Sequence, residues 1–507
     1  MASLTIRLHP ADNVVVAGVD LLPGTAIPGT SVEARAAIPS GHKVAVQAIA
    51  TGEPVRKYNQ VIGFATADIA PGDHVHVHNL GMGDSFERDH AFGADAKPTD
   101  HVPESERATF QGIVRPDGRV ATRNYIGVLT SVNCSATAAR MIADQFRGAA
   151  LADYPNIDGV VALTHGSGCG MGAQGEPIDL LRRTIGGYAR HPNFAAVIIL
   201  GLGCEVNQID KLVEAEGLAP TERLHTISIQ DIGGTAAAVR EGVRLIQSLL
   251  PQINDVKRET LPASHLTLAL QCGGSDGYSG ITANPALGYA VDLLIRNGGT
   301  AVLSETPEVY GAEHLLTRRA VTPEIGRKLV ERIGWWEEYT SRTGGEMNNN
   351  PSPGNKKGGL TTILEKSLGA VAKAGTTNLV DVVRYAEPIQ GPGLVFMDTP
   401  GYDPVSATGQ VAGGANVLCF TTGRGSVFGS KPTPSLKLAT NTPLYRRMTD
   451  DMDIDCGTIA TGDATIEEVG RQIFELVLAT ASGRKTKSEE LGFGADEFAP
   501  WQMGAVM

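Results

Sequence analysis

Three histidines alternate with valines in the stretch DHVHVHNLG, residues 73–81. On a β-strand, side chains two residues apart point to the same face, so His74, His76 and His78 are expected to share one face. Neutral imidazoles bind metals and transfer protons near neutral pH. Histidines on a strand are also common as solvated or structural residues, so this stretch alone leaves both interpretations open.

Four cysteines each follow a short apolar run: Cys134 after YIGVLTSVN, Cys169 after GVVALTHGSG, Cys204 after AVIILGLG and Cys272 after LTLALQ. The first three are spaced at intervals of 35 residues, about the length of one strand–helix–strand unit. All four are therefore expected at one edge of a parallel sheet, where ligands of such folds bind. Clustered thiolates suit an iron–sulfur cluster or one iron with mixed ligands, whereas cysteine that only packs is the alternative.

Acidic and basic residues follow other apolar runs. Glu305 comes directly after TAVLS, and His314 follows shortly after it. Two Gly-rich loops, 348–369 and 421–441, carry lysine and arginine that suit a carboxylate, or else form solvated turns. Neither loop matches a P-loop, and no strand leads into a Rossmann glycine motif, so we expect no nucleotide cofactor.

Short two-sided apolar runs alternate with helical segments from about residue 110 onward, which indicates parallel sheets covered on both faces. The sequence predicts an α/β protein: a small β-rich module at 1–80, a linker at 81–108, an α/β domain at 109–255 and a C-terminal α/β catalytic domain at 256–507. The last boundary falls in the polar segment 250–264.

The chain of 507 residues has a net charge of −12, which argues against a nucleic-acid partner. Its start lacks the pattern of a secretory signal, and no stretch has the ~18 apolar residues of a membrane helix. We expect a cytoplasmic protein with reduced cysteines and no membrane partner.

Several motifs together resemble the altronate/galactarate dehydratase family. They are GIVRPDGRVATRNYIGVLTSVNCSATAAR, LTHGSGCGMG, LGLGCEVNQ, QCGGSDGYSGITANPALG, SETPEVYGAEHLLTRRA, NPSPGNKKGGLTTILEKSLGA and GLVFMDTPGYDPVSATGQVAGGANVLCFTTGRGS. The N-terminal part, with LHPADNVVVAG, IPSGHKVAV and VHVHNLG, resembles the SAF-type module of these enzymes. The segment VNCSATAAR is similar to the altronate branch.

The resemblance implies an iron-dependent hydro-lyase that removes water from the 2,3-diol beside the carboxylate of a sugar acid, giving a 2-keto-3-deoxy acid. The enediolate formed when the α-proton leaves needs nearby positive charge, which a metal provides. The alternative on the same scaffold is elimination of sulfite from a small 2-hydroxy acid such as sulfolactate. Two less favoured hypotheses are a binding protein that has lost the activity of this scaffold and an aldolase that forms a Schiff base. We expect a homodimer as the default assembly.

The resemblance and the strand-end positions give three sets of candidate residues. The metal set is His76, His78, Cys134, Cys169, Cys204 and Cys272, and iron is the expected cofactor, as Fe²⁺ or as a cluster. The catalytic set is His42, Lys43, His165, Glu305 and His314. The set for substrate binding is Asn79, Lys57, Arg123, Asn355, Lys356, Arg424 and Lys431.

Overall fold

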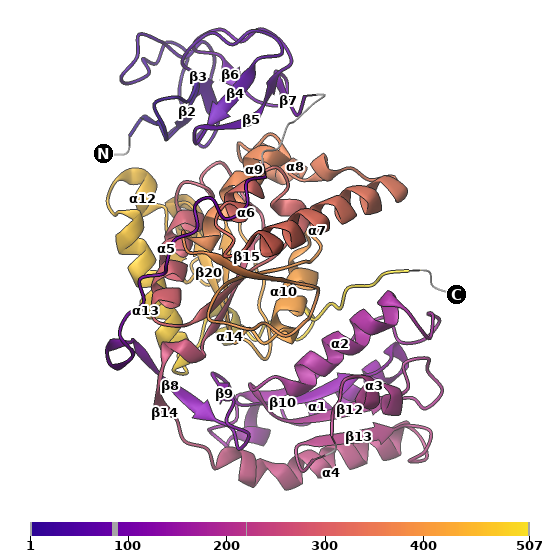
Figure 1. The fold of residues 1–507 in the computed structure, drawn as a ribbon. Coiled ribbons are helices and arrows are strands. Elements are labelled where there is room, and N and C mark those ends of the chain that lie inside the picture. Colours follow the sequence, from indigo (N-terminus) through magenta and orange to yellow (C-terminus); the bar gives the residue numbers. More distant parts are fainter. Residues whose placement is uncertain (1–2, 84–89, 220, 505–507) are drawn as a thin grey trace.

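The computed structural model describes residues 3–83, 90–219 and 221–504. Figure 1 shows a small β-rich module at one end, a domain with a four-stranded sheet at the other, and the C-terminal domain between them. The class predicted from the sequence, an N-terminal β module followed by two α/β domains with parallel sheets, is confirmed. Among the described residues no helix is both long and apolar enough to cross a membrane.

The N-terminal module is built from two antiparallel sheets. One has the order β1 (Thr5–Ile6), β2 (Val14–Ala17), β3 (Lys43–Ala45) and β6 (His74–Val75), and the other has β4 (Pro54–Lys57), β5 (Gln60–Ala65) and β7 (Leu80–Gly81). Apolar side chains such as Ile62 and Leu80 belong to the same hydrophobic cluster as Leu368 of the C-terminal domain. The module is therefore packed against that domain through a shared core.

The second domain has a parallel sheet in the order β11 (Gly159–Leu163), β10 (Tyr125–Thr130), β12 (Phe194–Gly201) and β13 (Leu224–Ser228). Its helices are α1 (Ala136–Asp144), α2 (Glu176–Arg190), α3 (Ile209–Ala215) and α4 (Thr235–Asn254). A small sheet of β14 (Glu259–Pro262), β8 (Thr109–Val114) and β9 (Val120–Ala121) lies where this domain meets the C-terminal one.

The C-terminal domain is built on a seven-stranded parallel sheet. The strand order is β17 (Leu379–Val383), β18 (Gly393–Met397), β16 (Thr300–Leu303), β15 (Thr267–Cys272), β19 (Val417–Thr422), β20 (Ser435–Ala439) and β21 (Ile454–Asp455). β15, β16, β18 and β19 are buried almost along their whole length, as the continuous apolar runs predicted.

Helices pack around this sheet. They are α5 (Ala283–Arg296), α6 (His314–Thr317), α7 (Pro323–Arg342), α8 (Pro353–Lys357), α9 (Ile363–Val371), α10 (Asp403–Ala412), α11 (Thr442–Arg447), α12 (Thr458–Thr461), α13 (Ile466–Ala481) and α14 (Lys487–Glu490). α8 and α9 lie under the N-terminal module in Figure 1. In the segment predicted as a linker, residues 90–108 contact the C-terminal domain, for example through Asp95 and Arg318, and residues 84–89 lie outside the described residues.

Candidate active site

Histidines of the N-terminal module gather at its contact with the C-terminal domain. One ligand nitrogen from each of His42, His74 and His76 lies within 4.8 Å of the others. The Nδ1 atom of His42 lies 3.0 Å from Nε2 of His74, and its Nε2 atom lies 3.2 Å from the carbonyl of Lys357. Because that carbonyl can only accept, His42 donates through Nε2.

These imidazoles are held neutral. Burial, followed by the charges of neighbouring cationic groups, lowers the pKa of His74 to about 4 and that of His76 to about 3. The Nδ1 atom of His76 is buried and has no hydrogen-bond partner among the described residues. Neutral imidazoles with free nitrogen atoms are able to accept a proton or bind a metal.

The prediction of a strand along the whole histidine stretch is wrong beyond Val75, because β6 ends there. Residues 76–79 form a turn in which the amide of His76 donates to Oδ1 of Asn79 and the amide of Asn79 donates to the carbonyl of His76, each at 2.9 Å. Asn79 thus stabilises a turn at residues where the alternating pattern predicts a strand. The turn brings His76 to His42 and leaves His78 exposed, although the His78 ring centroid lies 5.5 Å from that of His74.

Two lysines of the module share one carboxylate of the C-terminal domain. The Nζ atom of Lys43 lies 2.8 Å from Oε2 of Glu365, and the Nζ atom of Lys57 lies 3.0 Å from Oε1. All three side chains are essentially inaccessible to solvent. Burial opposes ionisation of Glu365, but the two lysines outweigh it and lower its pKa to about 2. This buried ion-pair cluster ties the module to α9.

A second donor set lies at the ends of β15 and β16. A ligand atom from each of Cys272, Glu305 and Glu308 lies within 4.8 Å of the others, and all three residues are buried. Glu305 has φ 70° and ψ 69°, a left-handed conformation that is rare for residues other than glycine. Neither carboxylate oxygen of Glu305 has a hydrogen-bond partner among the described residues. Burial, then the charge of Glu308, raises the pKa of Glu305 well above its usual range.

Lysines surround this donor set. Lys373 donates to Sγ of Cys272 at 2.9 Å and lies 3.8 Å from Oε2 of Glu305. Lys366 donates to Oε1 of Glu308 at 2.5 Å and to Oδ1 of Asn350 at 2.8 Å. A buried thiol and two buried carboxyl groups with cationic neighbours can bind a metal ion and the anionic substrate next to it.

Helix α9 lies between the N-terminal module and the second donor set. Glu365 faces the lysines of the module, whereas the next residue, Lys366, contacts Glu308. A narrow cavity is lined by Tyr58 of the module, by Glu365 and Lys366, and by Cys272 and Asp276. Tyr58 of the module therefore lines the same small cavity, of about 10 Å³, as Cys272 of the second donor set, and the three histidines are not part of its lining.

Three family models match consecutive parts of the chain. The Altronate/galactarate dehydratase SAF domain matches residues 3–83, the D-galactarate dehydratase/Altronate hydrolase second domain matches 112–254, and the D-galactarate/Altronate dehydratase C-terminal model matches 263–506. The chain belongs to the altronate/galactarate dehydratase family. It is an enzyme of the hydro-lyase class.

Curated relatives match the chain over nearly its full length. The galactarate dehydratase (L-threo-forming) of Escherichia coli K12 is 40% identical over 96% of this chain and 94% of its own. The altronate dehydratases of Bacillus subtilis 168 and of E. coli K12 are 35% and 36% identical, each over 99% of both chains. These identities divide between the two branches, so they do not favour the altronate branch indicated by VNCSATAAR.

The strand-end cysteines of this dehydratase-family chain do not share one sheet edge, which corrects the expectation from the sequence. Cys134, Cys169 and Cys204 follow β10, β11 and β12 of the second domain, whereas Cys272 ends β15 of the other sheet. Similar strand–loop patterns recur in both sheets, and local sequence does not tell which sheet a strand joins. The first three cysteines are exposed and Cys272 is buried.

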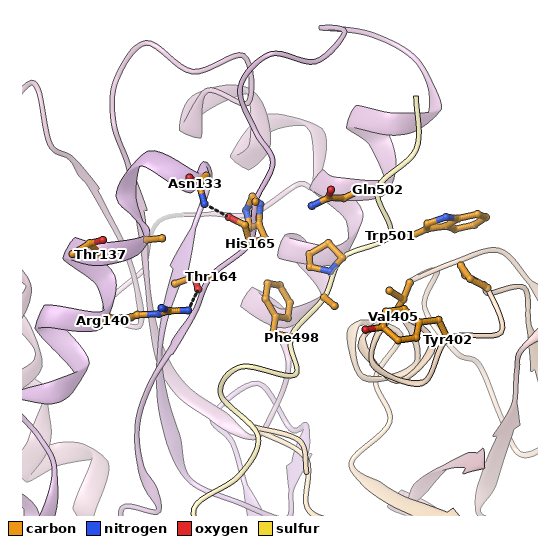
Figure 2. A pocket seen from close by; sticks show the side chains of 15 residues that line it. Asn133, Thr137, Arg140, Thr164, His165, Tyr402, Val405, Phe498, Trp501 and Gln502 are labelled. Atoms are coloured by element: carbon orange, nitrogen blue, oxygen red, sulfur yellow. Dashed lines mark hydrogen bonds between the residues drawn. The ribbon is translucent and has the colours of Figure 1, made fainter. Parts of the chain in front are cut away.

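His165 lies in the second domain with both ring nitrogens engaged. Its Nε2 atom lies 2.9 Å from the carbonyl of Thr130, and its Nδ1 atom accepts from the amide of Ser167 at 3.2 Å. Figure 2 shows it at the wall of a cavity of about 740 Å³ that Arg140, Phe498 and Trp501 also line. Among the described residues, the groups of three or more metal-binding side chains within 4.8 Å do not include residues of this cavity.

His314 begins α6 beside Glu313, whose carboxylate lies 3.1 Å from Nε2 of His90. Burial, followed by opposing effects of Glu313 and His90, lowers the pKa of His314. The described contacts of His314 do not include the residues of either donor set.

Three residues predicted to bind substrate have structural partners instead. Arg123 is buried, pairs with both carboxylate oxygens of Glu489 at 2.6 and 2.8 Å and donates to three backbone carbonyls. Asn355 forms a capping box with Ser352 at the start of α8 and donates to the carbonyl of Ser275 at 2.8 Å. Lys431 donates to the carbonyl of Gly492 at 3.0 Å.

Arg424 has the freedom that a substrate-binding residue needs. Its side chain is exposed, and its stem lies beside Gly274 and Gly358, next to the loop that contacts the histidines. None of the hydrogen bonds found among the described residues uses its guanidinium group. Lys356, in α8 of the same region, is half-buried.

The sequence reasoning named Cys272 and Glu305 but missed their partners. Glu308 lies in the segment SETPE, three residues after Glu305, the carboxylate that the sequence predicted. His74 belongs to the histidine stretch but is not among the metal ligands that the sequence predicted. Glu365, Lys366 and Lys373 lie in a mostly apolar helical segment, ILEKSLGAVAK, where charged residues usually face solvent.

Proposed function

We propose that this chain dehydrates a sugar acid of the altronate or galactarate type in a metal-dependent reaction at the interface of its N-terminal module and C-terminal domain. Family membership supports the reaction class. The observation that supports this location is Glu305: a fully buried carboxylate, in a strained backbone conformation, whose oxygen atoms lack hydrogen bonds among the described residues.

The donor set around Glu305 fits a metal ion. A thiolate with two carboxylates offers one soft and two hard ligands, a combination that suits iron(II) or another borderline metal. Burial raises the pKa of Cys272 to about 12, and ligation by a cation would replace its proton. A metal bound by Cys272, Glu305 and Glu308 would supply positive charge to the carboxylate end of the substrate as the α-proton leaves.

Side chains around the donor set complete the proposed site. Lys366 and Lys373, held at Glu308 and Cys272, add positive charge for an anionic substrate. Arg424 at the exposed side binds a substrate carboxylate through its free guanidinium group. Gly273 lets the carboxylate of Asp403 approach the end of β15, because a Cβ atom there would lie 2.1 Å from Oδ2 of Asp403.

Proton transfer is assigned to the imidazoles of the module. His76 is neutral and presents an unpartnered Nδ1 atom, so it is the group we place at the proton that leaves C2. His42 and His74 pack beside the imidazole of His76 and hold it in position. Lys43 and Lys57 serve docking, because the ammonium group of Lys43 already donates to Glu365 and, at 2.7 Å, to the carbonyl of Gly359.

The test is an assay of the purified chain, reconstituted anaerobically with iron(II), on altronate and galactarate. We expect a 2-keto-3-deoxy acid from one of them, abolished by a chelator and restored by iron(II). Sulfite release from sulfolactate without turnover of either sugar acid would support the sulfo-lyase alternative. Turnover that a chelator leaves unchanged would contradict metal dependence. The homodimer also remains a prediction, and light scattering would test it by measuring the mass of the protein in solution.

A further inference from the structure

Three cysteines of the second domain follow three neighbouring strands. The strands β11, β10 and β12 are adjacent and parallel, with Leu129 opposite Leu163 and Thr130 opposite Leu200 near their carboxyl ends. Adjacent strands lie about 4.8 Å apart. Cys134, Cys169 and Cys204 follow these ends within a few residues, so their loops emerge side by side from one sheet edge.

The three loops are hydrogen-bonded into one unit. The amide of Asn133 donates to the carbonyl of Ser167 at 2.9 Å, which joins the first loop to the second. The amide of Asn207 donates to the carbonyl of Gly168 at 3.0 Å, and its side chain donates to the carbonyl of Ser131 at 3.1 Å. Each cysteine therefore has a backbone position fixed relative to the other two.

Glycines permit this close approach. Gly168, next to Cys169, has φ +96°, and a Cβ atom there would lie 2.3 Å from the carbonyl oxygen of Ser131. Gly203, next to Cys204, has φ +125°, and a Cβ atom there would lie 2.6 Å from Oε1 of Gln230. Any other residue at position 168 would push the first two cysteine loops apart, whereas at position 203 it would displace the side chain of Gln230.

The exposure of these cysteines argues against a packing role. Cys134, Cys169 and Cys204 are all exposed and free, whereas Cys419 and Cys456, which do pack in the core, are fully buried. Exposed free thiols are avoided in proteins that have no use for them, because they oxidise. Three at one sheet edge indicate a shared ligand.

We propose that Cys134, Cys169 and Cys204 hold an iron–sulfur cluster, a centre separate from the donor set around Cys272. The three sulfur atoms do not lie within 4.8 Å of one another, as the ligands of a single ion would. In a cluster each thiolate binds a different iron, so the ligands stand farther apart. Three protein thiolates leave one iron of a cubane cluster without a protein ligand.

Two further features suit thiolates. The nine-residue helix α1 begins at Ala136, two residues after Cys134, and the positive end of its dipole favours anionic sulfur nearby. The side-chain amide of Gln230 donates to Sγ of Cys204 at 3.3 Å, and such hydrogen bonds to sulfur tune cluster potentials. The inference does not depend on where dehydration occurs.

The test is the iron and acid-labile sulfide content and the visible absorption of full-length protein purified without oxygen. We expect acid-labile sulfide with at least as much iron, because the donor set around Cys272 binds iron without sulfide. The sulfide and the visible absorption should be lost in Cys134→Ser, Cys169→Ser and Cys204→Ser. Cys272→Ser is the matched control and should keep both signals. Iron without sulfide, or absorption that none of the three substitutions lowers, would overturn the assignment.

Alkylation of the wild-type protein gives a second measurement that needs no variant. If a cluster is bound, the three exposed cysteines should be protected from iodoacetamide in the anaerobic protein and should react after the iron is chelated. Mass spectrometry of the peptides would identify them. Equal alkylation before and after chelation, in protein shown to contain iron and sulfide, would place the cluster elsewhere and reject these ligands.

Discussion

Lys43 of the N-terminal module donates to both carboxylate oxygens of Glu365 in α9, at 3.0 and 2.8 Å, and solvent reaches neither side chain. Lys57 donates to the same carboxylate at 3.0 Å. Two buried cations thus depend on one anion from another domain. Because both donor sets adjoin this cluster, the docking of the module and the geometry of the site are coupled.

Glu365→Gln is expected to destabilise the protein, because it leaves two buried ammonium groups without a counter-charge. Breaking a buried ion pair typically lowers the free energy of unfolding by about 3–5 kcal/mol. Lys57→Met should cost less, since Lys43 and Glu365 remain paired. Thermal unfolding monitored by circular dichroism measures both. A Glu365→Gln protein as stable as the wild type would show that these charges do not hold the module in place.

Arg424→Gln is expected to weaken substrate binding. Its free guanidinium lies at the exposed side of the site, and a charge-assisted hydrogen bond to a carboxylate contributes about 1.5–3 kcal/mol. KM should therefore rise roughly 10- to 100-fold, with kcat changed much less. Exposed Arg446 offers a matched control, Arg446→Gln. An unchanged KM in Arg424→Gln would remove this residue from the site.

His76→Ala is expected to lower kcat by roughly 100-fold or more, because general-base catalysis contributes about 10²–10⁴. The exposed neighbour gives the control, since His78→Ala should retain most activity. Metal content measured on the same samples separates two roles. Loss of the metal in His76→Ala would mean that the imidazoles, rather than Cys272, Glu305 and Glu308, are its ligands.

His191 predicts a pH-dependent stability that is unrelated to catalysis. Burial lowers its pKa from 6.5 to about 4, and its Nε2 atom lies 3.0 Å from the carbonyl of Ala415. Because the folded pKa is depressed, the unfolded chain binds the proton first. The contribution of neutral His191 is complete above about pH 6.5 and is lost as the pH falls toward 4.

Between about pH 7 and pH 5 the wild type should therefore lose roughly 2 kcal/mol more stability than His191→Gln, which has no titrating group at this position. Urea unfolding at the two pH values measures the difference. Parallel pH profiles for the two proteins would mean that His191 does not carry this dependence.

Strand and loop positions were predictable from the sequence to a useful degree. The runs TAVL and LTLALQ correspond to β16 and β15, and Glu305 and Cys272 lie at their ends as expected. These features are local, because a two-sided apolar run followed by Gly or polar residues predicts a buried strand and its ligand-binding end.

Partners from distant segments were not predictable in the same way. Glu365 and Lys366 lie in a helix whose burial depends on the docked module, so nothing local marks them as buried. Arg123 was predicted to bind substrate, but its partner Glu489 lies far along the chain. One sequence does not reveal which distant acid a basic residue will meet, and that pairing decides between a structural and a binding role.

Metal content and turnover of Glu305→Gln, measured beside the wild type and the exposed control Glu222→Gln, test the central claim most directly. Glu305→Gln keeps the shape of the side chain but removes its charge. We predict at least a 100-fold loss of dehydration and weaker binding of iron(II), with Glu222→Gln like the wild type. Full turnover and full metal content in Glu305→Gln would contradict the account.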